Sequence, residues 1–582
     1  MLAWLAPLDG VMNIWVRTIG ADDDRAVTDD TDRGVQGFFW APDGRRILFL
    51  RDAAGDENWR INDVHLESGA QRDLTPFDDV QARIEHVDKK FPTTILVGLN
   101  RDDPQLHDVY RLDLESGELT KIVENPGFAG FVTDEQQQVR GAAAPQPDGG
   151  IAILVRDDTD SDWRPVVEVG QTDSLTTAPV AFSADGRRLL IISSEDANAA
   201  RLAWLDLSTG ARTVVAEDPQ YDVGGVRVHP DTIEVEFVTF VKDRVEHVVL
   251  DPAVAPDVEG ITALDDGDWA LQGADHADRT WLVSFTLDDG PVRYWSWDRD
   301  AREGTFLFEH RPALSQYVLA KVEPFAFAAR DGLEVHGYLT FPPGMPRHDL
   351  PTVLVVHGGP WARDTWGFAP EAQWLANRGY LVIQVNYRGS TGFGKAFLNA
   401  GDKAWGAAMH DDLLDGLAWA VEQGHVDPAR VAIYGGSYGG YAALVGATFT
   451  PDVFACAIDV VGPSNLKTLI ESIPPYWAPL VAQFHTRVGN PETEEAFLWE
   501  RSPLSKVDQI RIPMLIAQGA NDPRVKQAES EQIVAAMVAN GIPHEYLLFE
   551  DEGHGFVKPE NRLRFYAAAE RFLAEHLGGR AE

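Results

Sequence analysis

A serine stands between two pairs of glycines in VAIYGGSYGGY, residues 431–441. Residues 435–439 fit the pattern G-x-S-x-G. The apolar residues before them predict a strand and the residues from 438 onward predict a helix. A serine at such a strand-to-helix turn has a strained backbone and an exposed hydroxyl, and it needs small neighbours because strand and helix crowd together there. The pattern predicts that Ser437 is a nucleophile rather than one more serine in a glycine-rich loop.

A serine hydroxyl is a weak nucleophile and needs an imidazole base that a carboxylate orients. Where the serine lies on this kind of turn, the chain order is Ser, then Asp, then His. Asp522 follows the apolar strand PMLIAQG, and His554 follows the strand EYLLFE. Both loops come at the carboxyl ends of their strands, where open α/β sheets bind ligands. We predict a catalytic triad of Ser437, Asp522 and His554.

Other acids compete with Asp522 for the third role. Asp551 and Glu552 lie too close in sequence to His554, so we interpret them as solvated loop acids. Weaker candidates by position are Asp452, Asp459 and Asp508. The segment MHDD also holds potential metal ligands at residues 410–412, but its place at the start of a helix favours capping and solvation. We predict neither a metal nor another cofactor.

The developing oxyanion needs fixed hydrogen-bond donors. One donor is predicted to be the backbone N–H of Tyr438, the residue after the nucleophile. The second should come from the loop after an early strand of the sheet, where the sequence reads HGGP at 357–360. Gly359 is the first choice for that donor and Gly358 the second, and the His357 side chain is interpreted as structural.

The elements that carry these residues alternate in type from about residue 325. Near-continuous apolar strands separated by amphipathic helices predict a parallel sheet covered on both faces, here an α/β-hydrolase domain over residues 316–582. The expected strands are 352–358, 380–388, 431–434, 454–462, 513–519 and 545–550. The expected helices lie near 370–378, 408–422, from 438, 527–540 and 562–577.

The first 310 or so residues show short strands with a repeat instead. FFWAPDGRRILFLRD at 38–52 resembles VAFSADGRRLLIISS at 180–194, and each has an Asp-Gly turn before an apolar strand. The turn at Gly117 follows the turn at Gly69 by one period of between 40 and 50 residues, and the turn at Gly210 follows after about two such periods. That period is typical of a β-propeller blade. We predict a propeller of about seven blades over residues 1–315, with six or eight blades or a pair of β-sandwiches as alternatives, and a hinge near 311–325.

Composition limits the partners. The net charge of −41 excludes nucleic acid and anionic membranes as expected partners. Cys456, the single cysteine, lies in an apolar run and is expected to be buried and inert. The N-terminal segment lacks the basic region of a signal peptide, and no window is long and apolar enough for a membrane span. These features predict a soluble, cytoplasmic protein.

Taken together, these motifs resemble the prolyl oligopeptidase family of serine peptidases, and most closely its acylaminoacyl-peptidase branch. The likeness lies in HGGP, NYRGSTGFG at 386–394, GGSYGGY, the ANDPRV loop and the GHGF loop. It is highly specific over about residues 325–580, whereas the propeller half resembles the family mainly in architecture. The family's triad falls on Ser437, Asp522 and His554.

The resemblance implies further roles. The family's arginine that binds a substrate backbone carbonyl falls on Arg524, for which a surface salt bridge is the alternative. A capping propeller would admit only short or unfolded peptides, and the family's frequent self-association implies that a homo-oligomer can form. Dipeptidyl peptidases of the family hold the substrate's amino terminus with adjacent propeller glutamates. No Glu-Glu pair precedes residue 325, which disfavours that branch.

The segment between the strands at 454–462 and 513–519 is the expected source of the S1 pocket. Its apolar candidates are Tyr476, Trp477, Val481 and Phe484, and Trp361 after HGGP is a further one. The alternative is that they only pack the helical lid.

The sequence therefore predicts a serine peptidase that acts on short peptides or acyl-peptides through an acyl-enzyme. It would release N-acylated amino acids or act as an oligopeptidase or aminopeptidase. The alternatives are an esterase or small-amide hydrolase on the same triad, and a catalytically inactive binding scaffold.

Overall fold

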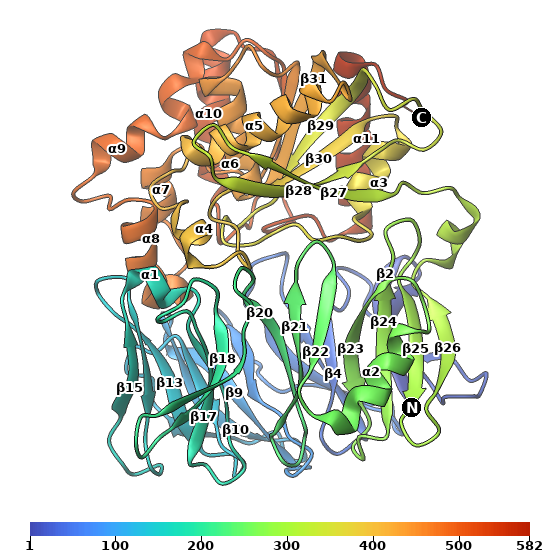
Figure 1. Cartoon of the computed structure of the whole chain (residues 1–582), viewed down its shortest axis with the longest axis vertical. Helices are drawn as coiled ribbons and strands as arrows, with labels where there is room; N and C mark the ends of the chain where they lie inside the picture. The colour runs from blue at the N-terminus through green and yellow to red at the C-terminus, as the bar shows by residue number, and fades with distance from the viewer. Residues whose placement is uncertain (582) are drawn as a thin grey trace.

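Seven antiparallel sheets make up the N-terminal half of the molecule. The structure, a computed structural model, describes residues 1–581. Figure 1 shows the strands of this half, in blue to green, below the α/β half, which runs from yellow-green to red. Five of the sheets have four strands, and the first and sixth have three. The propeller prediction with seven blades is confirmed, and the alternative of two β-sandwiches is wrong.

The blades follow the chain in order. Blade 1 is made of β1 (Leu2–Leu8), β2 (Val11–Arg17) and β3 (Arg25–Ala26). Blade 2 is made of β4 (Gly37–Trp40), β5 (Arg46–Arg51), β6 (Arg60–His65) and β7 (Gln71–Asp73). Blade 3 is made of β8 (Ala82–His86), β9 (Thr94–Asp103), β10 (Leu106–Asp113) and β11 (Leu119–Val123). Blade 4 is β12 (Gly130–Thr133), β13 (Val139–Pro145), β14 (Ile151–Val155) and β15 (Arg164–Val169); blade 5 is β16 (Ala178–Phe182), β17 (Arg188–Ser193), β18 (Arg201–Asp206) and β19 (Arg212–Ala216). Blade 6 is β20 (Val223–Val228), β21 (Val235–Val241) and β22 (Val245–Val249); blade 7 is β23 (Asp268–Ala274), β24 (Thr280–Thr286), β25 (Arg293–Asp298) and β26 (Glu303–Glu309).

The repeated turns explain why the sequence folds into blades. Gly69, Gly117 and Gly210 each have a positive φ and join the third and fourth strands of blades 2, 3 and 5. A left-handed φ costs glycine little, so these turns are permitted without strain. In blade 4 the connection from β14 to β15 lacks such a glycine, which accounts for the weak copy of the repeat between Gly117 and Gly210.

An eight-stranded sheet organises the C-terminal half. Its strand order is β27-β28-β30-β29-β31-β32-β33-β34, and pairing is parallel from β30 onward. Its strands are β27 (Val322–Ala328), β28 (Glu334–Thr340), β29 (Leu350–Val356), β30 (Leu381–Asn386), β31 (Val426–Gly436), β32 (Cys456–Val460), β33 (Met514–Gly519) and β34 (His544–Phe549). Every residue of β29, β30 and β33 is buried, as expected for strands covered on both faces.

Helices cover both faces of this sheet. One hydrophobic core joins the sheet to α4, α5, α6, α7 and α10, and a second core joins its other face to α3 and α11. The helices are α3 (Pro370–Asn377), α4 (Lys395–Asn399), α5 (Ala408–Glu422), α6 (Tyr438–Phe449), α7 (Leu466–Glu471), α8 (Val481–Arg487), α9 (Glu495–Glu500), α10 (Gln527–Asn540) and α11 (Pro559–Leu577). Short helices α1 (Gln171–Ser174) and α2 (Ala255–Thr262) belong to the propeller, and 3₁₀ turns are η1 (Pro252–Val254), η2 (Pro312–Gln316), η3 (Pro475–Leu480) and η4 (Pro503–Gln509).

The two halves are joined through η2. The last propeller strand ends at Glu309 and the first strand of the large sheet begins at Val322. Cys456 is fully buried, and burial raises the pKa of its thiol to about 12, as expected for an inert cysteine. Over residues 1–581, none of the helices has the length and apolar character needed to cross a bilayer.

Candidate active site

Ser437 lies at the turn between β31 and α6. Its φ of 59° and ψ of −120° place it in a strained region for a residue with a side chain. Its backbone N–H donates to the carbonyl of Val460 on the neighbouring strand, at 2.9 Å. Ser437 is partly accessible, whereas the residues on either side of the turn are mostly buried. The turn therefore presents this hydroxyl at the carboxyl edge of the sheet.

Glycines make this turn possible because strand and helix are in direct contact. A Cβ on Gly439 would lie 2.0 Å from the carbonyl oxygen of Val356 on β29. A Cβ on Gly435 would lie 2.6 Å from the same oxygen. Neither contact can be relieved by rotating a side chain, since both involve backbone atoms.

Asp522 and His554 meet in a hydrogen bond. The Nδ1 of His554 and the Oδ2 of Asp522 are 2.7 Å apart. The Asp522 side chain is fully buried, and its other oxygen accepts the backbone N–H groups of Arg524 and Val525 at 2.8 and 2.9 Å. Because the carboxylate occupies Nδ1, Nε2 is the ring nitrogen left to exchange a proton. Asp522 follows β33 and His554 follows β34, which pairs with β33. β33 in turn pairs with β32, which pairs with β31, the strand before Ser437.

The HGGP segment lies directly beside the serine. A Cβ on Gly358 would be 3.4 Å from the Cβ of Ser437, and Gly359 has a φ of 121°. Tyr438 is the first residue of α6, so its N–H is one of the helix amides without an intrahelical partner. The first turn of α6 and the backbone of this loop thus flank the serine.

The side chain of His357 packs against residues 387–390 and so anchors this loop. Its ring stacks on Tyr387 at a centroid distance of 4.4 Å, and its Nε2 is 3.1 Å from the Ser390 hydroxyl. Burial lowers the pKa of the ring, which favours the neutral form. These contacts fit a structural role.

Arg524 contacts the propeller. Its Nε is 2.8 Å from one oxygen of Glu57 and 3.0 Å from the other, and the hydroxyl of Tyr476 donates to the same carboxylate at 2.9 Å. Glu57 is buried, with a φ of 58°, in the loop between β5 and β6. The salt bridge expected as the alternative for Arg524 therefore exists, but it joins the two domains. Glu57 is not evident from the sequence, where its only local signal is its place in a polar, glycine-containing loop.

A cavity of about 610 Å³ opens around Glu57. Its walls come from blades 2 to 4, from η3 and from the loop after β33. They are Gly37, Phe38, Phe39, Leu50, Glu57, Trp59, Gln81, Ala82, Arg83, Ile84, Gln105, His107, Phe128, Ala129, Tyr476, Trp477, Pro479, Leu480 and Arg524. Burial lowers the pKa of His107 to about 3, so its ring is neutral at physiological pH. The cavity lining combines apolar and aromatic side chains with polar and charged ones.

The predicted S1 residues divide into two groups. Tyr476 and Trp477 line the cavity. Phe484 lies behind them, stacked on Trp477 at 5.9 Å between ring centroids and edge-on to Trp361 at 5.6 Å. Val481 is the first residue of α8 and is not part of the cavity wall.

Two expectations about acidic residues are wrong. Glu552 was expected to be solvated, but it is fully buried and ion-paired with Arg33 of the propeller at 2.7 Å. Asp412 was expected to cap and solvate its helix, but it is also fully buried and bonds Arg388 through both oxygens. In both cases a distant arginine compensates the charge, and no local pattern reveals such a partner.

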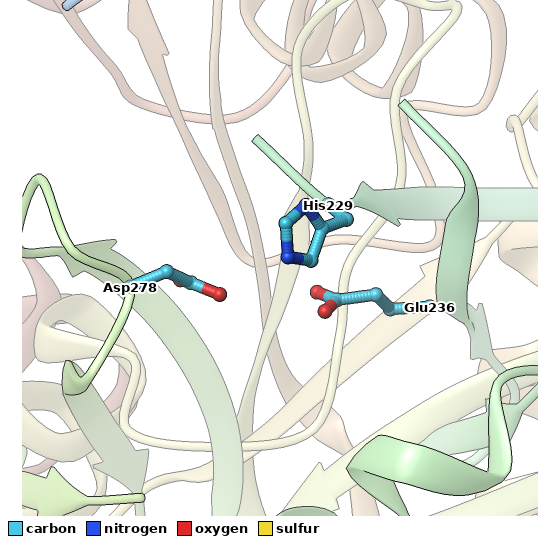
Figure 2. A group of neighbouring side chains, drawn as sticks. All are labelled: His229, Glu236 and Asp278. Carbon is cyan, nitrogen blue, oxygen red and sulfur yellow. The ribbon is translucent and has the colours of Figure 1, made fainter. Parts of the chain in front are cut away.

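A group of possible metal ligands lies far from this site in the propeller. Figure 2 shows His229, Glu236 and Asp278, whose ligand atoms lie within 4.8 Å of one another. Arg227 bonds Glu236 at 2.9 Å and Asp278 at 2.7 Å, and Arg299 also pairs with Asp278. Since arginines already neutralise both carboxylates, we interpret the group as an ionic cluster between blades 6 and 7.

Comparison with known proteins decides the family. The prolyl oligopeptidase family profile matches residues 366–580. Dipeptidyl aminopeptidase BIII of Pseudoxanthomonas mexicana is 46% identical over the whole chain and 86% of its own length. The chain belongs to the prolyl oligopeptidase family. It is therefore a serine peptidase, as the sequence predicted.

Further relatives match the chain to different extents. Dipeptidyl peptidase family member 6 of Caenorhabditis elegans is 34% identical, covering the whole chain and 84% of its own length. An acylamino-acid-releasing enzyme of Oryza sativa is 26% identical but covers 39% of the chain and 30% of its own length. The solved structure of a puromycin-hydrolysing peptidase of Mycobacterium tuberculosis superimposes with a TM-score of 0.79 at 22% identity, over 99% of this chain and 92% of that one, which shows a shared fold.

Proposed function

We propose that this serine peptidase is a dipeptidyl aminopeptidase that acts through Ser437, His554 and Asp522. His554 takes the Ser437 proton on Nε2 while the serine oxygen attacks the substrate carbonyl. The N–H groups of Tyr438 and Gly359 stabilise the oxyanion, and His554 then protonates the leaving amine. Water, deprotonated by His554, hydrolyses the acyl-enzyme.

Two features of the site support this mechanism. The 2.7 Å bond between Asp522 and His554 sets the ring so that Nε2 can act as base. The strained turn at Ser437 and the adjacent Gly358 and Gly359 backbone provide a nucleophile next to N–H donors.

The position of Glu57 is the main support for the proposed substrate class, peptides with a free amino terminus. It places a buried carboxylate in the cavity, 2.8 Å from an arginine that follows Asp522 by two residues. A carboxylate there can bind the ammonium of a free amino terminus, while Arg524 binds the carbonyl of the first residue. A single glutamate would thus do what the Glu-Glu pair does in the family's dipeptidyl peptidases, a pair that this sequence lacks before residue 325. The 46% identical relative is itself a dipeptidyl aminopeptidase.

The second candidate is release of N-acylated amino acids. The aromatic wall of the cavity, made by Phe38, Trp59 and Phe128, favours it because such a surface suits an uncharged acyl group. An acylated terminus carries no positive charge, so Glu57 would contribute nothing to its binding. The two candidates therefore differ in their dependence on Glu57.

The nucleophile is tested with a fluorophosphonate probe. We expect the wild type to be labelled at Ser437 and Ser437→Ala to show no labelling and a loss of several orders of magnitude in kcat. Labelling that persists in Ser437→Ala would contradict the assignment and would favour a different nucleophile. An unlabelled wild type would favour the inactive scaffold.

The substrate class is tested with matched chromogenic substrates. We expect Ala-Ala-p-nitroanilide to be cleaved faster than acetyl-Ala-Ala-p-nitroanilide and acetyl-Ala-p-nitroanilide. Glu57→Gln should lower kcat/KM for the free dipeptide about 10- to 100-fold, as for loss of a charged hydrogen bond worth about 1.4–2.7 kcal/mol, and leave the acetylated substrates unchanged.

The matched control is Asp56→Asn. Asp56 lies in the same loop as Glu57 but does not line the cavity. Its substitution by asparagine removes the same negative charge. It should change kcat/KM by less than threefold. Faster cleavage of acetyl-Ala-p-nitroanilide together with no effect of Glu57→Gln would show that the acylamino-acid-releasing candidate is correct.

A further inference from the structure

The loop that carries His554, residues 550–558, is closed on itself by one buried side chain. Glu552 comes two residues before His554, and its Oε1 accepts the backbone N–H groups of Val557 and Lys558 at 3.0 and 2.8 Å. The same oxygen accepts from Asn561 Nδ2 at 3.1 Å. This carboxylate therefore ties together the two arms of the loop on either side of His554.

The positive charge opposite Glu552 comes from the propeller. Arg33, between β3 and β4, places Nη1 2.7 Å from Oε2 of Glu552 and Nε 3.1 Å from Asp52. The side chains of Arg33, Glu552 and Asp52 are 8%, 0% and 2% exposed. A buried carboxylate without a charged partner is strongly unfavourable, so Glu552 depends on Arg33 of the propeller for its charge compensation.

Backbone contacts reinforce this connection. A Cβ on Gly553, next to His554, would lie 2.0 Å from the carbonyl oxygen of Gly55 in the propeller. Asn521, next to Asp522, donates from Nδ2 to the carbonyl of Ala54 at 3.0 Å and from its backbone N–H to the backbone carbonyl of Glu552 at 2.9 Å. The propeller loop at 53–58 is thus in direct contact with the loops of both His554 and Asp522.

We propose that Glu552 is a positioning residue, and that Arg33 of the propeller holds it so that the loop at 550–558 presents His554 to Ser437. The propeller then does more than restrict access, because it completes the support of the general base. This inference rests on the triad of the proposed function. Placing an imidazole wrongly by a fraction of an ångström slows acyl transfer, whereas substrate binding in the cavity is affected much less.

Two substitutions test the proposal. Arg33→Met removes the guanidinium at similar length. Glu552→Gln leaves a single side-chain oxygen, which can serve either the loop amides or Arg33 but not both. We expect each variant to lower kcat and the rate of Ser437 phosphonylation by a small fluorophosphonate 10- to 100-fold, with KM within threefold of the wild type. Arg33→Lys keeps the charge and should recover part of that loss.

Lys395→Met is the matched control. It breaks another ion pair between the domains, with Asp173 at 2.6 Å, that does not contact the loop at 550–558. We expect its kcat and phosphonylation rate to stay within threefold of the wild type. An equal loss in Lys395→Met would show general loosening of the interface and overturn the proposal, as would unchanged rates in Arg33→Met and Glu552→Gln.

Two further outcomes keep the test decisive. If Arg33→Met does not fold, Glu552→Gln and Arg33→Lys are compared with Lys395→Met by the same criteria. If His554→Ala is phosphonylated as fast as the wild type, the triad assignment fails rather than the role of Glu552.

Discussion

At the scale of single residues, the site depends on how closely backbones approach each other. Gly439 and Gly435 bring α6 against the end of β29, and Gly440 brings the same helix against Asp459, whose Oδ1 would lie 2.3 Å from a Cβ there. Each glycine permits a contact that any larger residue would prevent. The position of Ser437 follows from these contacts as much as from its own φ and ψ.

Gly439→Ala should therefore abolish most of the activity. The added Cβ would meet the Val356 carbonyl oxygen at 2.0 Å, so the start of α6 must move away from the sheet and carry Ser437 with it. We expect kcat to fall at least 100-fold. Gly436→Ala is the control, because its nearest contact is 3.8 Å away, and it should lose less than fivefold. Similar kcat values for the two variants would contradict this steric account.

At the scale of elements, β32 carries an unusual buried acid. Asp459 is fully buried, its Oδ1 accepts the N–H of Gly462 at 2.9 Å, and its Oδ2 has no hydrogen-bond partner among the described residues. Burial raises the pKa of this carboxyl to about 8. The strand pairs with β31, so a charge on Asp459 would develop next to the turn that holds Ser437.

This raised pKa predicts how stability depends on pH. The folded protein holds the Asp459 proton up to about pH 8, whereas the unfolded chain releases it near its ordinary value of 3.8. The contribution of this group to stability is therefore complete below about pH 4 and is lost as pH rises to 8, by about 1.4 kcal/mol per pH unit. Asp459→Asn should remove this slope. Urea unfolding of both proteins at pH 5, 6, 7 and 8 measures it, and parallel curves would refute the prediction.

At the scale of the whole molecule, ion pairs and hydrogen bonds connect the propeller to the α/β domain at several places. Arg33 with Glu552, Arg524 with Glu57 and Lys395 with Asp173 are ion pairs across this boundary. Gln483 of α8 also donates to the propeller residues Gly149 and Ser174. Figure 1 shows α8 and α4 above the propeller next to α1. The boundary between the two domains is thus held by polar contacts from several loops and helices.

Arg487 is the most deeply buried of these connecting cations. It is 1% exposed, pairs with Asp402 at 2.8 Å, and donates to the propeller carbonyl of Gln171. Arg487→Met should lower the free energy of unfolding by about 3–5 kcal/mol, because Asp402 is left without its charged partner. Calorimetry measures this loss, with His485→Ala on the same helix as the control. Equal unfolding temperatures for wild type and Arg487→Met would contradict the prediction.

Local pattern alone determined much of this protein. The alternation of strands and helices predicted the α/β domain, and a repeat of between 40 and 50 residues predicted the propeller. Both patterns can be read locally, because the spacing of apolar side chains in each element depends on residues close together in the sequence. The chain order of Ser437, Asp522 and His554 also predicted a site, since parallel strands bring their carboxyl ends to one edge of a sheet.

Only the tertiary structure decided what surrounds those three residues. Glu57 comes from a propeller loop more than 460 residues before Arg524, and Arg33 lies more than 500 residues before Glu552. Charge compensation acts through space, so a buried acid and a solvated one look alike in sequence until their partners are known. The sequence therefore predicts the nucleophile, whereas the groups that we propose to select its substrate and to position its base depend on how the two domains meet.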